Sequence, residues 1–286
     1  MTMQLKTAGS QFFVPDGVSD EEALSRTTCI GVSAHQDDLE IMSFHGIIEC
    51  FAQTDKWFGG VIVTNGAGAP RADIYGDYTD EMMMEVRARE QKKAAYVGEY
   101  SYQALLHYSS SAVKDPANTD PTDELKMLFE KSRPSRIYTH NLADKHDTHV
   151  GVTLAVIEAC RQLPAEIRPK EVWGCEVWRD LDWMTDSDKV VLDCTPHENL
   201  QAALLGVFDS QVCGGKRYDL ATLGRRRAHA TYHESHGVDV AELLNFGMDL
   251  TPLVNDPQLS VQAYVKGYLD RMYDEVSARI GKVGGR

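Results

Sequence analysis

The chain is poor in cysteine and in basic residues. Its six cysteines are scattered, and no C-x-x-C pair occurs, which argues against a thiolate zinc site and against a dense disulfide framework. Only 29 basic residues stand against 43 acidic ones, giving a formal net charge of −14. Because such a chain repels a phosphodiester backbone, we expect no nucleic-acid partner. The one basic cluster, Arg225 to Arg227, is predicted to be a solvated helix face.

Long apolar segments and targeting signals are also missing. No stretch approaches the roughly 20 apolar residues needed to span a bilayer, so no membrane association is expected. The first 28 residues lack a basic start, an apolar core and a small-residue cleavage site. Together with the scattered cysteines, this pattern predicts a cytoplasmic protein.

What is present is the pattern of an α/β protein. Apolar, β-branched runs alternate with segments of helical period, which predicts a Rossmann-like fold: a mostly parallel sheet flanked by helices. We expect a single domain over residues 1–286, with a core at about 28–235 and a C-terminal helical extension at about 236–286. An amphipathic helix at 258–280 is predicted to pack on the sheet or on a neighbouring subunit, so a homo-oligomer is left open. Strands are expected at 28–33, 60–64, 104–108, 136–139, 172–178 and 189–194, and the main helices at 40–52, 79–97, 122–132, 148–163, 197–212 and 218–232.

The first chemically informative segment follows the first expected strand. His35, Asp37 and Asp38 come directly behind the apolar run at 29–33, and the carboxyl ends of parallel strands are where α/β folds place their ligands. One imidazole and one carboxylate can bind a metal such as zinc. The side chains of adjacent residues diverge, so the neighbouring carboxylate stays free to handle protons.

A second cluster follows the strand expected at 136–139. His146 and His149 are three residues apart at the start of a helix, where they share a face and can reach one centre. His35, Asp38 and His149 would form a two-histidine, one-carboxylate site with open positions. That set suits zinc in hydrolysis and also iron in non-haem oxygenases, so ligand type alone does not fix the metal.

At these residues the chain resembles the PIG-L/LmbE family of metal-dependent N-deacetylases. The resemblance covers roughly positions 28–235 and includes two metal motifs at a suitable separation. The matching segments are Ala34-His35-Gln36-Asp37-Asp38, Val63-Thr64-Asn65-Gly66, Arg87-Ala88-Arg89-Glu90, His146-Asp147-Thr148-His149 and Ser210-Gln211.

The resemblance implies a role for each matching residue. A zinc ion, or another divalent metal such as Fe²⁺, is expected as the cofactor. The implied roles are metal ligation by His35, Asp38 and His149, proton transfer by Asp37, oxyanion stabilisation by His146, and substrate binding by Arg87 held by Glu90.

Three residues depart from the family pattern. Gln36 replaces the usual proline, His45 replaces a small residue, and Thr148 stands where a carboxylate beside the histidine ligand is expected. The partner that tunes His146 is therefore Asp147, Asp144 or absent.

The function expected from this resemblance is removal of an N-acetyl or other N-acyl group from an amino sugar or a related polar small molecule. Arg87, the loop from Asn65 to Tyr78 and the aromatic residue Trp178 are expected to bind that substrate. Three alternatives keep the same pocket: an amidase acting on a thiol conjugate, a metal-dependent oxygenase, or a sugar- or metabolite-binding protein without catalytic activity.

Overall fold

The described part of the chain, residues 3–285, contains one eight-stranded sheet. In this computed structural model the strand order is β1-β4-β3-β2-β5-β6-β8-β7. Strands β4, β3, β2, β5 and β6 pair in parallel, whereas β1, β8 and β7 join through antiparallel pairs. The strands are β1 (Gln11–Phe13), β2 (Cys29–Ser33), β3 (Phe58–Thr64), β4 (Tyr102–Tyr108), β5 (Arg136–His140), β6 (Glu171–Cys175), β7 (Lys189–Asp193) and β8 (Leu244–Asp249).

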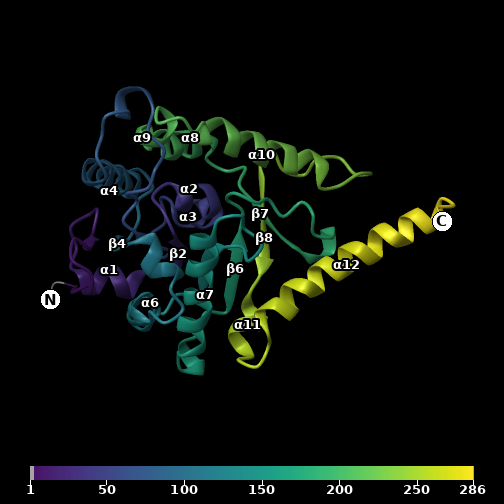
Figure 1. Ribbon diagram of the computed structural model, residues 1–286, viewed down its shortest axis with the longest axis horizontal. Coiled ribbons are helices and arrows are strands. Elements are labelled where there is room, and N and C mark those ends of the chain that lie inside the picture. The colour runs from purple at the N-terminus through teal and green to yellow at the C-terminus, as the bar shows by residue number, and fades with distance from the viewer. Residues whose placement is uncertain (1–2, 286) are drawn as a thin grey trace.

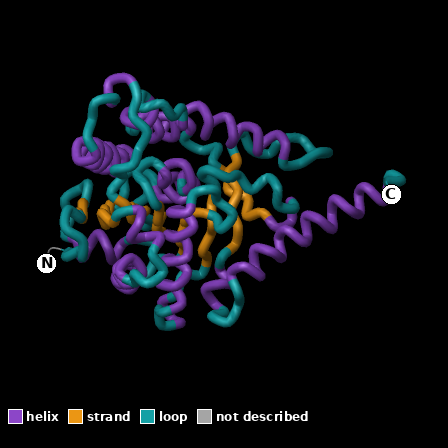
Figure 2. Tube along the Cα trace, in the orientation of Figure 1, coloured by secondary structure: helices purple, strands orange, loops and turns teal. Residues whose placement is uncertain are grey.

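Helices cover both faces of this sheet, so the mostly parallel, helix-flanked fold expected from the sequence is confirmed (Figures 1 and 2). The helices are α1 (Asp20–Arg26), α2 (Asp38–Met42), α3 (Phe44–Cys50), α4 (Asp80–Val97), α5 (Ser110–Lys114), α6 (Asp120–Ser132), α7 (Asp147–Arg161), α8 (Glu198–Gly206), α9 (Asp209–Val212), α10 (Tyr218–Tyr232), α11 (Thr251–Asn255) and α12 (Val261–Lys282). Helices α4, α8, α9 and α10 lie on one side, and α1, α6, α7 and α11 lie on the other (Figure 1). None of the helices between residues 3 and 285 combines the length and the apolar character needed to cross a membrane.

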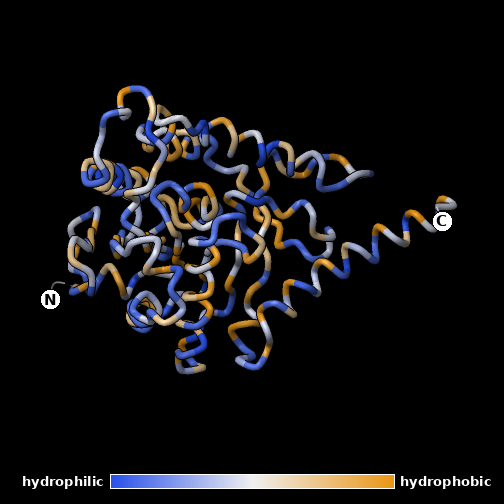
Figure 3. The backbone as a smooth tube through the Cα atoms, in the orientation of Figure 1, coloured by the Kyte–Doolittle hydropathy of each residue, from blue (hydrophilic) through white to orange (hydrophobic). Residues whose placement is uncertain are grey.

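The core consists of two apolar layers, one on each face of the sheet. Because side chains alternate along a strand, Val61 and Val63 of β3 join one layer, while Phe58 and Ile62 join the other. Hydrophobic residues accordingly concentrate along the central strands (Figure 3). Strands buried on both faces read as continuous apolar runs, which is why the sequence revealed them.

The chain reverses its direction of winding between β2 and β5. Strands β3 and β4 are added on one side of β2, whereas β5 and β6 are added on the other. Such a switch point opens a crevice at the carboxyl ends of the two adjacent strands. The segment beginning at His35 leaves β2 there, and the segment leading to α7 leaves β5 there.

The helix expected at 40–52 is divided into α2 and α3 at Ser43. The carbonyl groups of Glu40 and Ile41 accept hydrogen bonds from the Arg226 guanidinium, and the carbonyl of Met42 accepts one from Asn245. These partners come from α10 and β8, far away in the sequence. The prediction that Arg225 to Arg227 form a solvated face is wrong at its centre, because Arg226 is 1% exposed.

The C-terminal segment contributes more than a helix. Strand β8, within the expected extension at 236–286, lies between β6 and β7 and is therefore part of the sheet. Helix α12 follows and is fixed at its start by Tyr264, whose hydroxyl donates to the Asp249 carbonyl at 2.6 Å. The remainder of α12 projects from the body (Figure 1). Leu269 and Ile280, expected to be covered, are half exposed.

Candidate metal centre and active site

Three potential ligand atoms converge where β2 and β5 end. The distances are 3.2 Å from His35 Nδ1 to Asp38 Oδ2, 3.1 Å from His35 Nδ1 to His149 Nε2, and 3.3 Å from His149 Nε2 to Asp38 Oδ2. Metal bonds of about 2.0–2.2 Å at tetrahedral angles separate neighbouring ligand atoms by about 3.3–3.6 Å. The triangle, with sides of 3.1–3.3 Å, is slightly smaller than one face of a four-coordinate zinc site.

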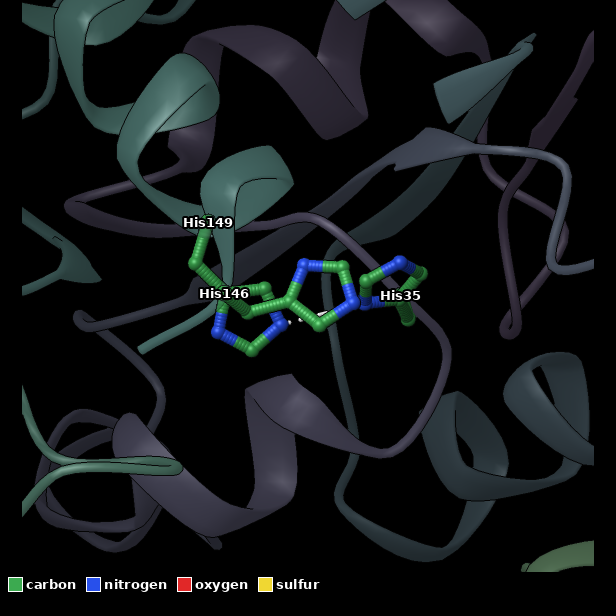
Figure 4. A group of neighbouring side chains, drawn as sticks. All are labelled: His35, His146 and His149. Atoms are coloured by element: carbon green, nitrogen blue, oxygen red, sulfur yellow. Dashed lines mark hydrogen bonds between the residues drawn. The ribbon is translucent and has the colours of Figure 1, made fainter. Parts of the chain in front are cut away.

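Local structure explains how these residues come together. His35 lies in the loop after β2, and Asp38 opens α2 three residues later. A side chain at Gly31 would place its Cβ 2.5 Å from Leu39, so the glycine lets α2 pack directly on β2. His149 lies in the first turn of α7, and its ring stacks on that of His146 with centroids 4.7 Å apart. Figure 4 shows His146 and His149 converging with His35 from the opposite side.

A fourth histidine, His140, lies beside the cluster but is already engaged. Its Nε2 is 3.6 Å from Asp38 Oδ2, and the same atom accepts a 2.8 Å hydrogen bond from the Ala34 backbone N–H. Its ring also stacks on His149 with centroids 3.9 Å apart. His140 therefore supports the cluster, because its lone pair at Nε2 is used by the backbone.

Asp144 contacts His149 at the ring nitrogen that faces away from the ligand triangle. Its Oδ1 lies 3.4 Å from His149 Nδ1, the carboxylate–histidine–metal arrangement that orients many metal ligands. The same oxygen accepts a hydrogen bond from the His146 backbone, and Oδ2 accepts one from the Trp178 backbone at 3.1 Å. Of the partners considered for His146, Asp144 thus orients His149 instead, and the exposed Asp147 makes no side-chain hydrogen bond within residues 3–285.

A hydrogen bond from the backbone determines which nitrogen of the His146 ring carries the proton. His146 is the N-cap of α7, and its Nδ1 accepts a hydrogen bond from the Thr148 N–H at 3.3 Å. A neutral imidazole that accepts at Nδ1 carries its proton at Nε2. His146 therefore presents a donor to the pocket, although Thr148 supplies no carboxylate.

Asp37 is held in a strained conformation beside the cluster. Its φ is 90°, in a region that costs a non-glycine residue free energy and that clusters at functional sites. Its carboxylate lies 3.8 Å from Arg87, whose guanidinium also donates to the carbonyls of Gly66 and Gln36. The surrounding structure thus holds a second carboxylate beside the ligand triangle.

The two adjacent aspartates differ in their electrostatics. Burial, followed by repulsion from Asp38, raises the pKa of Asp37 well above its ordinary value. Burial acts on Asp38 too, but the imidazoles of His149, His35 and His140 outweigh it and hold the pKa of that carboxyl below its usual range. One carboxylate is thereby kept ionised while its neighbour has a high affinity for a proton.

The cluster opens into a pocket of about 330 Å³. Sequence reasoning placed Arg87 and Trp178 here, and both line it; it missed Lys216, Tyr218 and Ser110. The lining is His35, Asp37, Asp38, Gly66, Gly68, Ala69, Pro70, Arg87, Ser110, His146, Trp178, Gln211, Lys216 and Tyr218.

Two other expected site residues, Asn65 and Glu90, lie outside this pocket, and so does His45. Asn65 lines a separate cavity. Glu90 makes no ion pair with Arg87 within 4.0 Å in residues 3–285 and accepts two hydrogen bonds from Ser210. His45 contacts the Tyr138 hydroxyl at 2.8 Å, outside the pocket.

Glu40, just behind the ligand segment, predicts a pH-dependent stability. Burial raises its pKa from 4.5 to about 7, although Tyr100 and Gln91 donate to its carboxylate. Since the folded state binds this proton more tightly than the unfolded state, stability falls as the pH rises from about 4.5 to 7. The free energy of unfolding of Glu40→Gln, taken relative to that of the wild type, should therefore rise by up to about 3 kcal/mol between pH 5 and pH 8. The measurement is urea unfolding of both metal-free proteins. An equal difference between the two proteins at both pH values would contradict this assignment.

Fold and site together define an α/β protein with a two-histidine, one-carboxylate cluster at the switch point of its sheet. Residues 30–160 match the PIG-L family model, described as GlcNAc-PI de-N-acetylase, so this part of the chain is a PIG-L family domain. No curated protein sequence matches the chain significantly.

Solved structures share the fold at low sequence identity. GalB, the 4-carboxy-2-hydroxymuconate hydratase from Pseudomonas putida KT2440, is 17% identical with a TM-score of 0.60, over 78% of this chain and 95% of that one. The N,N'-diacetylchitobiose deacetylase from Pyrococcus horikoshii is 16% identical with a TM-score of 0.58, over 78% and 84%. The zinc-inhibited form of teicoplanin deacetylase Orf2 is 13% identical with a TM-score of 0.55, over 77% and 97%.

Proposed function

We propose that the protein is a zinc-dependent hydrolase that removes an N-acetyl or other N-acyl group from an amino sugar or a related polar small molecule. The observation that carries this proposal is the ligand triangle of His35, Asp38 and His149, with Asp37 and His146 lining the same pocket. The PIG-L domain over residues 30–160 supports the same chemistry.

The three ligands would hold a divalent ion, zinc by preference and Fe²⁺ as the alternative. When bound, such an ion supplies Lewis acidity and lowers the pKa of water to about 7. His35, Asp38 and His149 leave the pocket side of the triangle open to substrate. Asp144 keeps the His149 ring oriented toward that centre.

Asp37 would act as the general base and then as the general acid. It takes a proton from the attacking water and returns it to the departing amine nitrogen. A carboxylate whose pKa lies well above its ordinary value is a stronger base at neutral pH than an exposed aspartate. Arg87 lies 3.8 Å away and holds the deprotonated form in place.

His146 would stabilise the oxyanion of the tetrahedral intermediate. Its Nε2–H, set by the hydrogen bond at Nδ1, is directed toward the pocket. Removing one such donor typically costs about 3 kcal/mol of transition-state stabilisation. Trp178 would provide an aromatic wall for the sugar ring.

The proposal predicts stoichiometric release of amine and carboxylic acid. The protein loaded with one equivalent of Zn²⁺ would be incubated with N-acetylglucosamine, N,N'-diacetylchitobiose and a panel of other N-acylated amines. Free amine would be measured by fluorescamine and acetate by NMR. One equivalent of zinc is chosen because the relative teicoplanin deacetylase has a zinc-inhibited form; Fe²⁺ under anaerobic conditions forms a second arm.

Because GalB, a hydratase, has a similar fold, the fold alone does not determine which reaction is catalysed. Equal amounts of amine and acetate would support the proposal. Turnover restricted to thiol conjugates would make the protein an amidase of that class, and consumption of O₂ with iron would make it an oxygenase. Tight sugar binding without release of amine under any metal would contradict catalysis and indicate a binding protein.

A further inference from the structure

Lys216 lies in the wall of the pocket with no anionic partner. Its Nζ is 4.8 Å from the centroid of the Trp178 ring, and Tyr218 meets the same indole edge-on at 6.1 Å. No carboxylate in residues 3–285 lies within 4.0 Å of this ammonium. In a chain of net charge −14, this partly exposed lysine therefore has no acidic neighbour to neutralise it.

The other cation of the pocket, Arg87, already has partners within the protein. Arg87 donates to two backbone carbonyls and lies 3.8 Å from Asp37, so its guanidinium is used within the protein. Lys216 Nζ donates no hydrogen bond within residues 3–285. Its three donors are therefore available to a ligand.

Lys216 is fixed near the reacting centre through Trp178. The backbone N–H of Trp178 donates to Asp144 Oδ2 at 3.1 Å, and the other oxygen of that carboxylate faces His149. Trp178 is thereby tied to the ligand cluster, and the ammonium above its ring shares the pocket with Asp37 and His146. A substrate whose amide lies at the cluster would extend along this wall.

We infer that the substrate carries a carboxylate or phosphate group, which pairs with Lys216 beside the Trp178 ring. This inference rests on the proposed function, because that function places the acyl amide at the ligand cluster. A neutral sugar would be accommodated by the aromatic wall and would leave the ammonium unpaired. An anionic group forms a charge-assisted hydrogen bond with it, about twice as strong as a neutral one.

The test compares neutral and anionic substrates with the same acetamide. N-acetylglucosamine serves as the neutral probe, its 1-phosphate and 6-phosphate as the phosphate probes, and N-acetylmuramic acid as the carboxylate probe. We expect at least one anionic probe to have a KM about 10-fold below that of the neutral one. Lys216→Met should abolish this preference by raising KM for the anionic probes, and Lys216→Arg should retain it.

A matched control is the same exchange at Lys92. Its Nζ also lies over an aromatic ring, 5.5 Å from the centroid of Phe13, but outside the pocket. Lys92→Met should leave the preference intact. If Lys216 only packs on Trp178, Lys216→Met would instead raise KM equally for neutral and anionic probes, which would overturn the inference.

Binding measurements separate this inference from the proposed function. The same probes and inorganic phosphate would be titrated calorimetrically into wild type and Lys216→Met. Anion binding that depends on Lys216, without release of amine, would support the anionic subsite and reject the hydrolase. Deacetylation of neutral and anionic probes with equal KM would support the hydrolase and reject the anionic subsite. Absence of any Lys216-dependent anion binding overturns the inference.

Discussion

Asp37→Asn is expected to lower kcat about 10²–10⁴-fold while the bound metal remains at one equivalent. Asparagine keeps the shape of the side chain and is among the residues that best tolerate a positive φ, so the turn after His35 should survive. What is lost is the ability to accept the proton of the attacking water and to return it to the amine. KM should change little, because Asp37 is assigned to the reaction rather than to binding.

The matched variant is Asp38→Asn, one residue further along. It should lose metal, because it changes a vertex of the ligand triangle, whereas Asp37→Asn should not. Activity and metal content measured side by side, by amine release and elemental analysis, separate the two roles. Wild-type turnover by Asp37→Asn, or loss of its metal with retention by Asp38→Asn, would reverse the assignment.

His149→Ala should abolish the stabilisation that metal provides. An ion present at 100 times its dissociation constant stabilises a protein that binds it only when folded by about 2.7 kcal/mol. Chelation should therefore lower the free energy of unfolding of the wild type by about this amount and leave that of His149→Ala unchanged. The measurement is urea unfolding with and without chelator, at fixed pH.

His45→Ala is the control for this experiment. His45 is partly buried and is hydrogen-bonded to Tyr138, but it lies outside the pocket. Its variant should keep the full effect of chelation, even if its baseline stability falls. A His149→Ala protein that still responds to chelator like the wild type would show that the ion binds elsewhere.

The fold could be predicted where local sequence determines structure. The central strands are buried on both faces and therefore read as apolar runs, and α4 begins at the Thr79 cap and ends before Gly98 as expected. Strand β8 was missed because Asn245 and Gly247 interrupt its pattern, and it is held by its neighbours β6 and β7. The break between α2 and α3 likewise depends on Arg226, which is remote in the sequence.

The same distinction applies to the site. His35, Asp38 and His149 could be grouped because each follows a recognisable strand, and strand ends meet at one edge. Lys216 could not, since it lies in the irregular segment between α9 and α10, which carries no periodic signal. Tyr218 begins the helix expected at 218–232, but nothing in the helical pattern indicated that it lines the pocket. Asn65 was placed in the pocket by its position after β3, but it lines a different cavity.

Asp144 couples the metal ligands to the substrate-binding wall, and this coupling constrains which substitutions the pocket can accept. One carboxylate orients a metal ligand and, through its second oxygen, anchors the backbone of the aromatic wall. A substrate that shifts Trp178 must therefore alter metal affinity, and by linkage the metal must alter substrate affinity by the same factor. Selection for a new substrate would act on both affinities at once, so specificity and metal retention would evolve together.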